Sequence, residues 1–164
     1  CPRHGGGSTT DILLSSLTAP AHAYTIPRGA DPDDVSFDSY PRDRRLLYSY
    51  QRPLAVLCNE NSFSNAEIFS HSIKTTGRGV LVGTQTFGGV ISTGSFSLID
   101  GDRVRMPFRG WYLPDGTDME ENGAIPDIDV PITPADEVAD RTPQLDAAVD
   151  ALMRGMEGGR RTSR

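Results

Sequence analysis

Hydrophobic residues are distributed along this chain in several distinct patterns, and each pattern predicts a different element. Residues 54–58 read Leu-Ala-Val-Leu-Cys without a polar interruption, which is typical of a strand buried on both faces. The next segment places Phe69 and Ile73 on one helical face and reaches Gly77, where we expect the helix to end. Residues 80–82 form a second apolar run. Strand, helix and strand in this order predict a parallel unit.

Three further elements follow from the same kind of pattern. Polar residues 8–10 can cap a leucine-rich helix that ends before Pro20. Hydrophobic and polar residues alternate on both sides of residues 100–101, an Asp-Gly pair, and this predicts a β-hairpin. A last amphipathic helix is expected to begin at Pro143, because proline is favoured at the first helical position.

The length and composition are typical of one globular domain, with 164 residues of which 37% are hydrophobic and 23% are charged. We expect this domain to cover residues 1–156, with an irregular excursion over 18–50 and a flexible tail over 157–164. The excursion is rich in proline, and short strands are expected only around Tyr24 and over 46–50. A loop of this length is often a functional cover over a site.

Several classes of partner are excluded by the same composition. The net charge of −6 argues against nucleic acid, whose phosphates require clustered Lys and Arg. No apolar run approaches the roughly 18 residues of a membrane-spanning helix. Cys1 and Cys58 match no metal or redox spacing, so we expect neither a metal nor a disulfide framework. The cytoplasm and the cell envelope both stay open as the compartment.

Ser64 is the first candidate for chemistry, because it stands where a buried strand turns into a helix. That position exposes a hydroxyl and aims the first backbone N-H groups of the helix at a ligand. An acyl-transfer nucleophile requires this arrangement, since each preorganised N-H donor stabilises the oxyanion by ~3 kcal/mol. Ser64 and Glu67 also match a capping box, in which the serine only begins the helix. Both interpretations stay open from the spacing alone.

A glycine-rich loop over residues 5–7 offers a second set of N-H groups, although a plain loop is the more common explanation. The three histidines supply no convincing base. His71 follows Ser64 by two helical turns, about 10 Å of rise, too far to take its proton. His4 adjoins the glycine loop, and His22 lies in the excursion. Glu120 lies in an acidic turn; such carboxylates are usually solvated, but a buried one could orient a base or a water.

Four motifs in order resemble the tail-specific and tricorn serine peptidases: residues 3–7, 59–69, 82–90 and 119–127. The resemblance covers nearly the whole chain outside the excursion and the tail. It implies an α/β fold like that of crotonase and the Clp protease subunit, a spiral of strand-strand-helix units, which we expect to be incomplete at its N-terminus. It also implies that the chain is the C-terminal part of such a peptidase domain.

The resemblance assigns roles to individual residues. Ser64 would be the nucleophile, the N-H of Asn65 would be one oxyanion donor, and Gly6 or Gly7 would supply the second. Residues 1–5 read Cys-Pro-Arg-His-Gly where the family has Asp-x-Arg-x-Asn, so the choice between the two glycines stays open.

Two branches of the family activate the serine differently, and the sequence discriminates between them. The tail-specific branch uses a lysine where this chain has Gly89, and has a glutamine where this chain has Thr93. The lysine mechanism is therefore excluded. The tricorn branch has Gly-Gly-Val, as residues 88–90 do here, and uses a histidine base supported by a glutamate. Glu120 is the residue that matches this glutamate.

The base histidine of the tricorn branch lies upstream of the glycine loop and has no counterpart in these residues. We expect it to come from an upstream module of the same parent protein, so the isolated chain should be weakly active or inactive. The implied partner is a peptide substrate, and further copies of the chain could bind through Trp111. No cofactor is implied. The alternative is a non-catalytic ligand-binding protein, or an inactive member, with the same fold.

Overall fold

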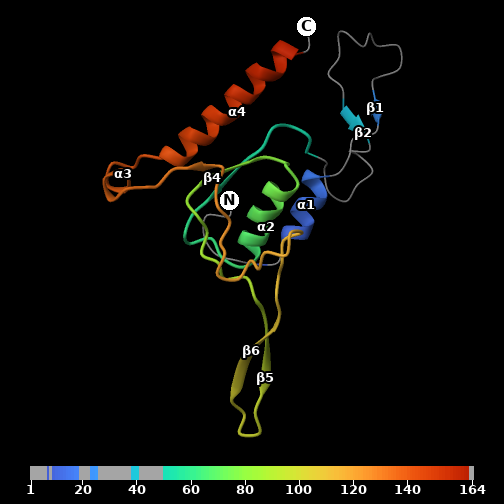
Figure 1. Cartoon of the computed structure of the whole chain (residues 1–164), viewed down its shortest axis with the longest axis vertical. Coiled ribbons are helices and arrows are strands. Elements are labelled where there is room, and N and C mark those ends of the chain that lie inside the picture. The colour runs from blue at the N-terminus through green and yellow to red at the C-terminus, as the bar shows by residue number, and fades with distance from the viewer. Residues whose placement is uncertain (1–6, 8, 19–22, 26–37, 41–49, 163–164) are drawn as a thin grey trace. The chain divides into compact units, whose positions relative to one another are not determined.

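The computed structural model describes residues 7, 9–18, 23–25, 38–40 and 50–162 (Figure 1). The chain divides into two compact units, one over residues 9–52 and the other over residues 1–8 and 53–164. Each unit is described by itself. Among the described residues, no helix combines the length and the apolar character needed to cross a membrane.

The larger unit is built on a short parallel sheet with the strand order β3-β4-β7. The strands are β3 (Ala55–Cys58), β4 (Val80–Gly83) and β7 (Ile128–Asp129), and helix α2 (Asn65–Thr75) connects the first two. The predicted parallel strand-helix-strand unit is therefore confirmed. Helix α2 packs against both β3 and β4. The buried side chains of these three elements include Val56, Cys58, Ile73, Leu81 and Val82.

Helix α4 (Pro143–Thr162) covers the same sheet through contacts with β3 and β4. It begins at the predicted proline, and Gln144 and Ala148 are buried on its inner face. The helix continues to Thr162, six residues into the segment that the sequence predicts as a tail. A short helix, α3 (Pro134–Val138), precedes it and is capped by Thr133, whose hydroxyl accepts a hydrogen bond from the N-H of Asp136.

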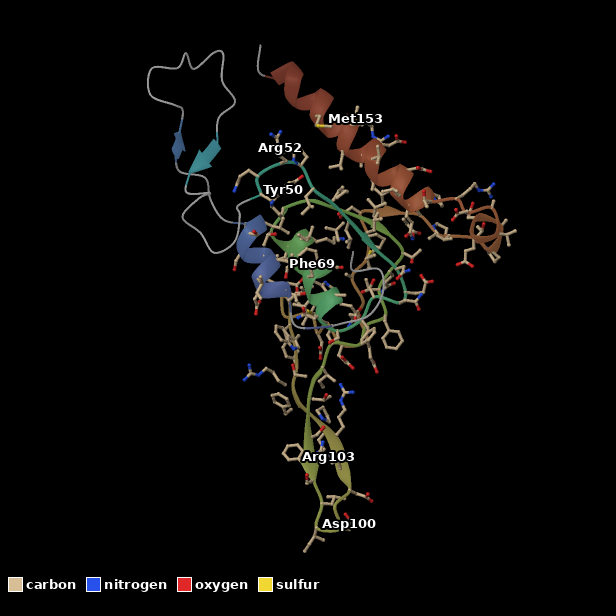
Figure 2. All side chains as sticks on the ribbon, turned by 180° about the vertical axis from the view of Figure 1, so that it is seen from behind. Tyr50, Arg52, Phe69, Asp100, Arg103 and Met153 are labelled. Atoms are coloured by element: carbon tan, nitrogen blue, oxygen red, sulfur yellow. The ribbon has the colours of Figure 1, made fainter. Side chains whose placement is uncertain are left out.

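The predicted β-hairpin is confirmed as the antiparallel pair β5 (Ser92–Ser97) and β6 (Arg103–Arg109). The N-H of Leu98 donates to the carbonyl of Asp102 at 2.8 Å, and Gly101 takes a φ of 92° in the turn. Every residue of β6 is exposed. Figure 2 shows Asp100 and Arg103 near the tip of this hairpin.

The smaller unit contains helix α1 (Thr10–Leu17) and a two-stranded antiparallel pair, β1 (Ala23–Thr25) with β2 (Asp38–Tyr40). Helix α1 and the strand around Tyr24 were both expected from the sequence. The partner strand β2 was not, and residues 46–49 of the other expected strand lie outside the described residues. Tyr50 is not in a strand; its N-H donates to the carbonyl of Ser16 at 2.9 Å.

Candidate active site

Ser64 occupies a strained turn between β3 and α2. The strand ends at Cys58, residues 59–63 turn the chain, and Ser64 precedes the first helical residue. Its backbone has φ 57° and ψ −125°, a conformation that L-residues rarely adopt. Such a residue costs about 1–3 kcal/mol and persists only where its surroundings hold it in place. A sharp, strained strand-to-helix turn is also how the nucleophilic serine of α/β-hydrolases is presented.

Both backbone groups of Ser64 are held by hydrogen bonds. Its N-H donates to the carbonyl of Gly89 at 2.8 Å and to Oε2 of Glu67 at 3.2 Å. Its carbonyl accepts from the N-H groups of Glu67 at 2.9 Å and Ile68 at 3.1 Å. The capping box that the sequence indicates is present. Cap and strained turn therefore occur together at this serine.

The loop that follows β4 lies beside Ser64 and is fixed along its backbone. The consecutive N-H groups of residues 86–91 all donate hydrogen bonds to groups elsewhere in the same unit. In order, their acceptors are the carbonyls of Ala124 and Ser62, then Oε1 and Oε2 of Glu67, then twice Oε2 of Glu120. A loop held at each of these positions has little freedom to move away from Ser64.

Two glycines allow this loop to fit. Gly88 has a φ of 87°, and a Cβ atom built on it would lie 3.1 Å from the backbone carbon of Glu121. Gly123 lies beneath the loop, where a Cβ atom would lie 2.0 Å from the carbonyl oxygen of Thr86. These close approaches of backbone to backbone explain why glycine is required at both positions.

Glu120 is half-buried and binds the two loop residues that directly follow Gly89, whose carbonyl accepts the N-H of Ser64. Its Oε2 accepts the N-H groups of Val90 and Ile91, each at 2.7 Å. The side chains of Ile68, Val90 and Met119 form a buried hydrophobic cluster beneath these contacts. Glu120 is therefore not a freely solvated surface acid. The structure brings it to the same loop as Ser64, while its role in catalysis stays a prediction.

The structure describes two of the three residues that are predicted as oxyanion donors. Asn65 is the first residue of α2, and the next three N-H groups, of residues 66–68, donate to the carbonyls of Phe63 and Ser64. Gly7 is exposed, with open space where a Cβ atom would stand. Gly6 lies outside the described residues. The assignments of Asn65, Gly6 and Gly7 stay predictions.

His71 is a buried structural residue. Its Nε2-H donates to the carbonyl of Asn122 at 3.2 Å, which ties α2 to the segment that follows Glu120. Burial lowers the pKa of His71, while the hydrogen bond to Asn122 and the charge of Glu67 act in the opposite direction. The neutral form is therefore favoured. His4 and His22 lie outside the described residues.

Cys58 is the other potential nucleophile near this turn. Its thiol is buried and donates to the carbonyl of Thr84 at 3.3 Å. Burial, reinforced by the charge of Asp127, raises the pKa of Cys58 to about 12. A thiol with this pKa is protonated at neutral pH and is a poor nucleophile. Within the described part of the chain, no group of three His, Cys, Asp or Glu side chains is arranged to hold a metal.

Glu67 is the residue whose importance the sequence underestimates. Its spacing from Ser64 indicates only a capping box, yet its carboxylate also binds Thr86, Gly88 and Gly89. The signal for these contacts is weak: an acid in the first turn of a helix, and a glycine pair that exposes two N-H groups. Nothing in the local pattern says that the two segments meet.

Peptidase family S41 matches residues 3–130, which is more than half of the chain. The chain belongs to peptidase family S41. The matched range includes Ser64, the loop beside it and Glu120.

Tricorn proteases are among the relatives of this S41 chain. It is 34% identical over 154 residues to tricorn protease homolog 1 of Streptomyces coelicolor, and the alignment covers 93% of this chain and 14% of the relative. It is 32% identical over 152 residues to the tricorn protease of Thermoplasma acidophilum, and the alignment covers 92% of this chain and 13% of the relative. The chain therefore spans only a small part of these relatives, and the resemblance to the tricorn branch is confirmed.

The fold comparison agrees with the family. The crystal structure of the tricorn protease matches with a TM-score of 0.77 and 30% identity, over 93% of this chain and 14% of that one. The predicted α/β fold class of the tricorn-type peptidases is therefore confirmed.

Proposed function

We propose that this chain carries the nucleophile of a serine peptidase, and that Ser64 forms an acyl-enzyme with a peptide substrate. One observation carries the proposal. Ser64 stands in a strained strand-to-helix turn with φ 57°, and its own N-H donates to the carbonyl of Gly89 at 2.8 Å. Membership of a peptidase family supports the reaction class. The buried thiol of Cys58, with its pKa raised to about 12, is a poor competitor for this role.

In the proposed cycle, the base takes the proton of the Ser64 hydroxyl while Oγ attacks the peptide carbonyl carbon. The oxyanion that forms accepts hydrogen bonds from the N-H of Asn65 and from Gly6 or Gly7. Collapse of this intermediate breaks the peptide C-N bond, and the amine leaves with the proton that the base carried. Water then attacks the acyl-enzyme, releases the acid product and restores Ser64.

We propose that Glu120 supports the base. Both hydrogen bonds from the loop reach its Oε2, which fixes the orientation of the carboxylate. Oε1 would then accept the ring N-H of the base histidine and stabilise the imidazolium that forms when the proton is taken. This role does not require Glu120 to become protonated.

The base histidine is proposed to come from outside this chain. His71 is unsuited to the task because it is buried and bonded to Asn122. The relatives are much longer than the matched part, since the chain covers 14% and 13% of them. The isolated chain should therefore react slowly.

A fluorophosphonate probe tests the proposal in the full encoded protein. Ser64→Ala should abolish both labelling and peptide hydrolysis, because it removes the attacking oxygen. Ser97→Ala, an exposed serine on the hairpin, is the control and should react like the unmodified protein. Undiminished hydrolysis by Ser64→Ala would show that Ser64 is not the nucleophile.

A second arm locates the base. Residues 1–164 alone should be labelled at least about 10³-fold more slowly than the full encoded protein, because a serine without its base loses most of its reactivity. Equally rapid labelling of both would show that the base lies within these residues, and His4 would become the candidate.

The same probe separates the peptidase from the non-catalytic alternative. A ligand carrier or an inactive member would keep the fold but would not react with a fluorophosphonate. A described cavity of about 510 Å³ near residues 59–61 is lined mainly by polar and charged side chains, such as Asn59, Glu137 and Arg141. A cavity of this composition does not favour an apolar ligand.

A further inference from the structure

Glu67 is fully buried, with an exposed fraction of 0%, yet it carries a carboxylate. A buried carboxylate is costly unless hydrogen-bond donors surround it. Here four donors do so. Oε1 accepts from the hydroxyl of Thr86 and the N-H of Gly88, both at 2.5 Å, and Oε2 accepts from the N-H of Gly89 at 2.8 Å and of Ser64 at 3.2 Å.

These contacts do more than begin a helix. A capping glutamate needs only one bond, to the N-H of the residue three positions earlier. The other three bonds of Glu67 reach a loop that lies 19 to 22 residues away in sequence. Glu67 therefore joins the turn that carries Ser64 to the loop beside it, and the Ser64 N-H closes the connection through its bond to the carbonyl of Gly89.

Two carboxylates bind neighbouring parts of this loop. Glu67 accepts the N-H groups of Gly88 and Gly89, and Glu120 accepts those of the next two residues, 90 and 91. A change in the position of either carboxylate would move the segment between them. That segment contacts the backbone of the proposed nucleophile on one side and the proposed support of the base on the other.

We propose that Glu67 is a positioning residue for the reaction of Ser64. It holds Ser64 in its strained backbone conformation and keeps Gly88 and Gly89 fixed beside it. This inference rests on the proposed function. It acts through geometry, because displacing a reacting group by about 1 Å can cost about 10²-fold in rate.

Glu67→Gln tests this role in the full encoded protein. Glutamine has nearly the same shape, but its NH₂ group would face a pair of donors where the carboxylate offers an acceptor. We expect the maximal rate of fluorophosphonate labelling to fall about 10²-fold, while the half-saturating probe concentration stays within about twofold. Glu137→Gln, which removes the same charge from an exposed position, should leave both quantities unchanged.

Thr86 provides a second test that does not depend on how well Glu67→Gln folds. Thr86→Val removes the hydroxyl that donates to Glu67 and accepts from the N-H of Ala124 at 2.7 Å, so labelling should slow about fivefold. Thr86→Ser keeps both hydrogen bonds and should restore the rate.

The outcomes separate this inference from the proposed function. If Ser64→Ala is still labelled, the proposed function fails. If Ser64→Ala is inert but folded Glu67→Gln is labelled at the unmodified rate, only the positioning role fails. A rise in the half-saturating concentration alone, or a Thr86→Ser variant as slow as Thr86→Val, would also overturn it, because either would indicate lost packing or lost binding rather than lost positioning.

Discussion

The loop beside Ser64 and the hairpin that follows it are neighbours in sequence but differ in how they are held. In residues 86–91 each backbone N-H donates to a group in the surrounding unit, including two carboxylates. In β6 every residue is exposed, and the hairpin is held mainly by its own strand pairing. A two-stranded pair is marginal by itself in water. Of these two regions, only the loop beside the proposed nucleophile is held along its backbone by the surrounding unit.

The same substitution beneath the loop and in the hairpin turn should give the largest difference. Gly123→Ala places a Cβ atom 2.0 Å from the carbonyl oxygen of Thr86, so the backbone beneath the loop must move. We expect a loss of about 4 kcal/mol or more in the free energy of unfolding. Gly101→Ala, at φ 92° in open space at the hairpin turn, should cost only about 1–2 kcal/mol of backbone strain. Urea denaturation of both variants measures the difference, and equal losses would contradict it.

Glu120→Gln tests the catalytic side of the comparison. The amide oxygen can still accept the N-H groups of Val90 and Ile91, but the negative charge that supports the base is lost. We expect kcat/KM for peptide hydrolysis by the full encoded protein to fall about 10²-fold or more, while the melting temperature changes little. Glu121→Gln, the exposed neighbouring acid, is the control. A normal rate for Glu120→Gln would remove Glu120 from the mechanism.

A valine substitution measures how the packing of the hairpin differs from that of the core sheet next to the loop. Val82 has an exposed fraction of 0% in β4, whereas Val104 is 38% exposed in β6. Val82→Ala should lower the free energy of unfolding by about 2 kcal/mol, because it leaves a cavity in the core. Val104→Ala should cost about 0.5 kcal/mol or less. Similar losses would mean that the hairpin is buried in solution.

The smallest expected effect concerns pH. Burial lowers the pKa of His71 below its ordinary value of 6.5. The unfolded chain therefore binds a proton more readily, so this contribution to stability is present above pH 6.5 and is lost as the pH falls toward the folded-state pKa. His71→Gln should flatten the decline in melting temperature between pH 7.5 and 5. An unchanged decline would assign it to other groups.

Much of the fold could be predicted from the sequence, because local patterns determine it. The run at 54–58, the helical spacing of Phe69 and Ile73, and the turn at 100–101 each specify an element through nearby residues. The pairing of β1 with β2 could not be predicted, because a strand as short as Asp38–Tyr40 has no distinctive pattern.

The candidate site could be predicted only in part from local sequence patterns. Ser64 could be found because a serine between a buried strand and a helix is a local signal. The resemblance to the family, rather than any spacing, indicated Glu120. The contacts of Glu67 with Thr86, Gly88 and Gly89 join segments about 20 residues apart, and their hydrogen bonds depend on tertiary packing.

Locating the fluorophosphonate adduct tests most directly whether Ser64 is the nucleophile. The full encoded protein is treated with a fluorophosphonate, digested, and its peptides are mapped by mass spectrometry. We expect one adduct, on Ser64, which disappears in Ser64→Ala together with peptide hydrolysis. An adduct on another residue that persists in Ser64→Ala along with hydrolysis would contradict it.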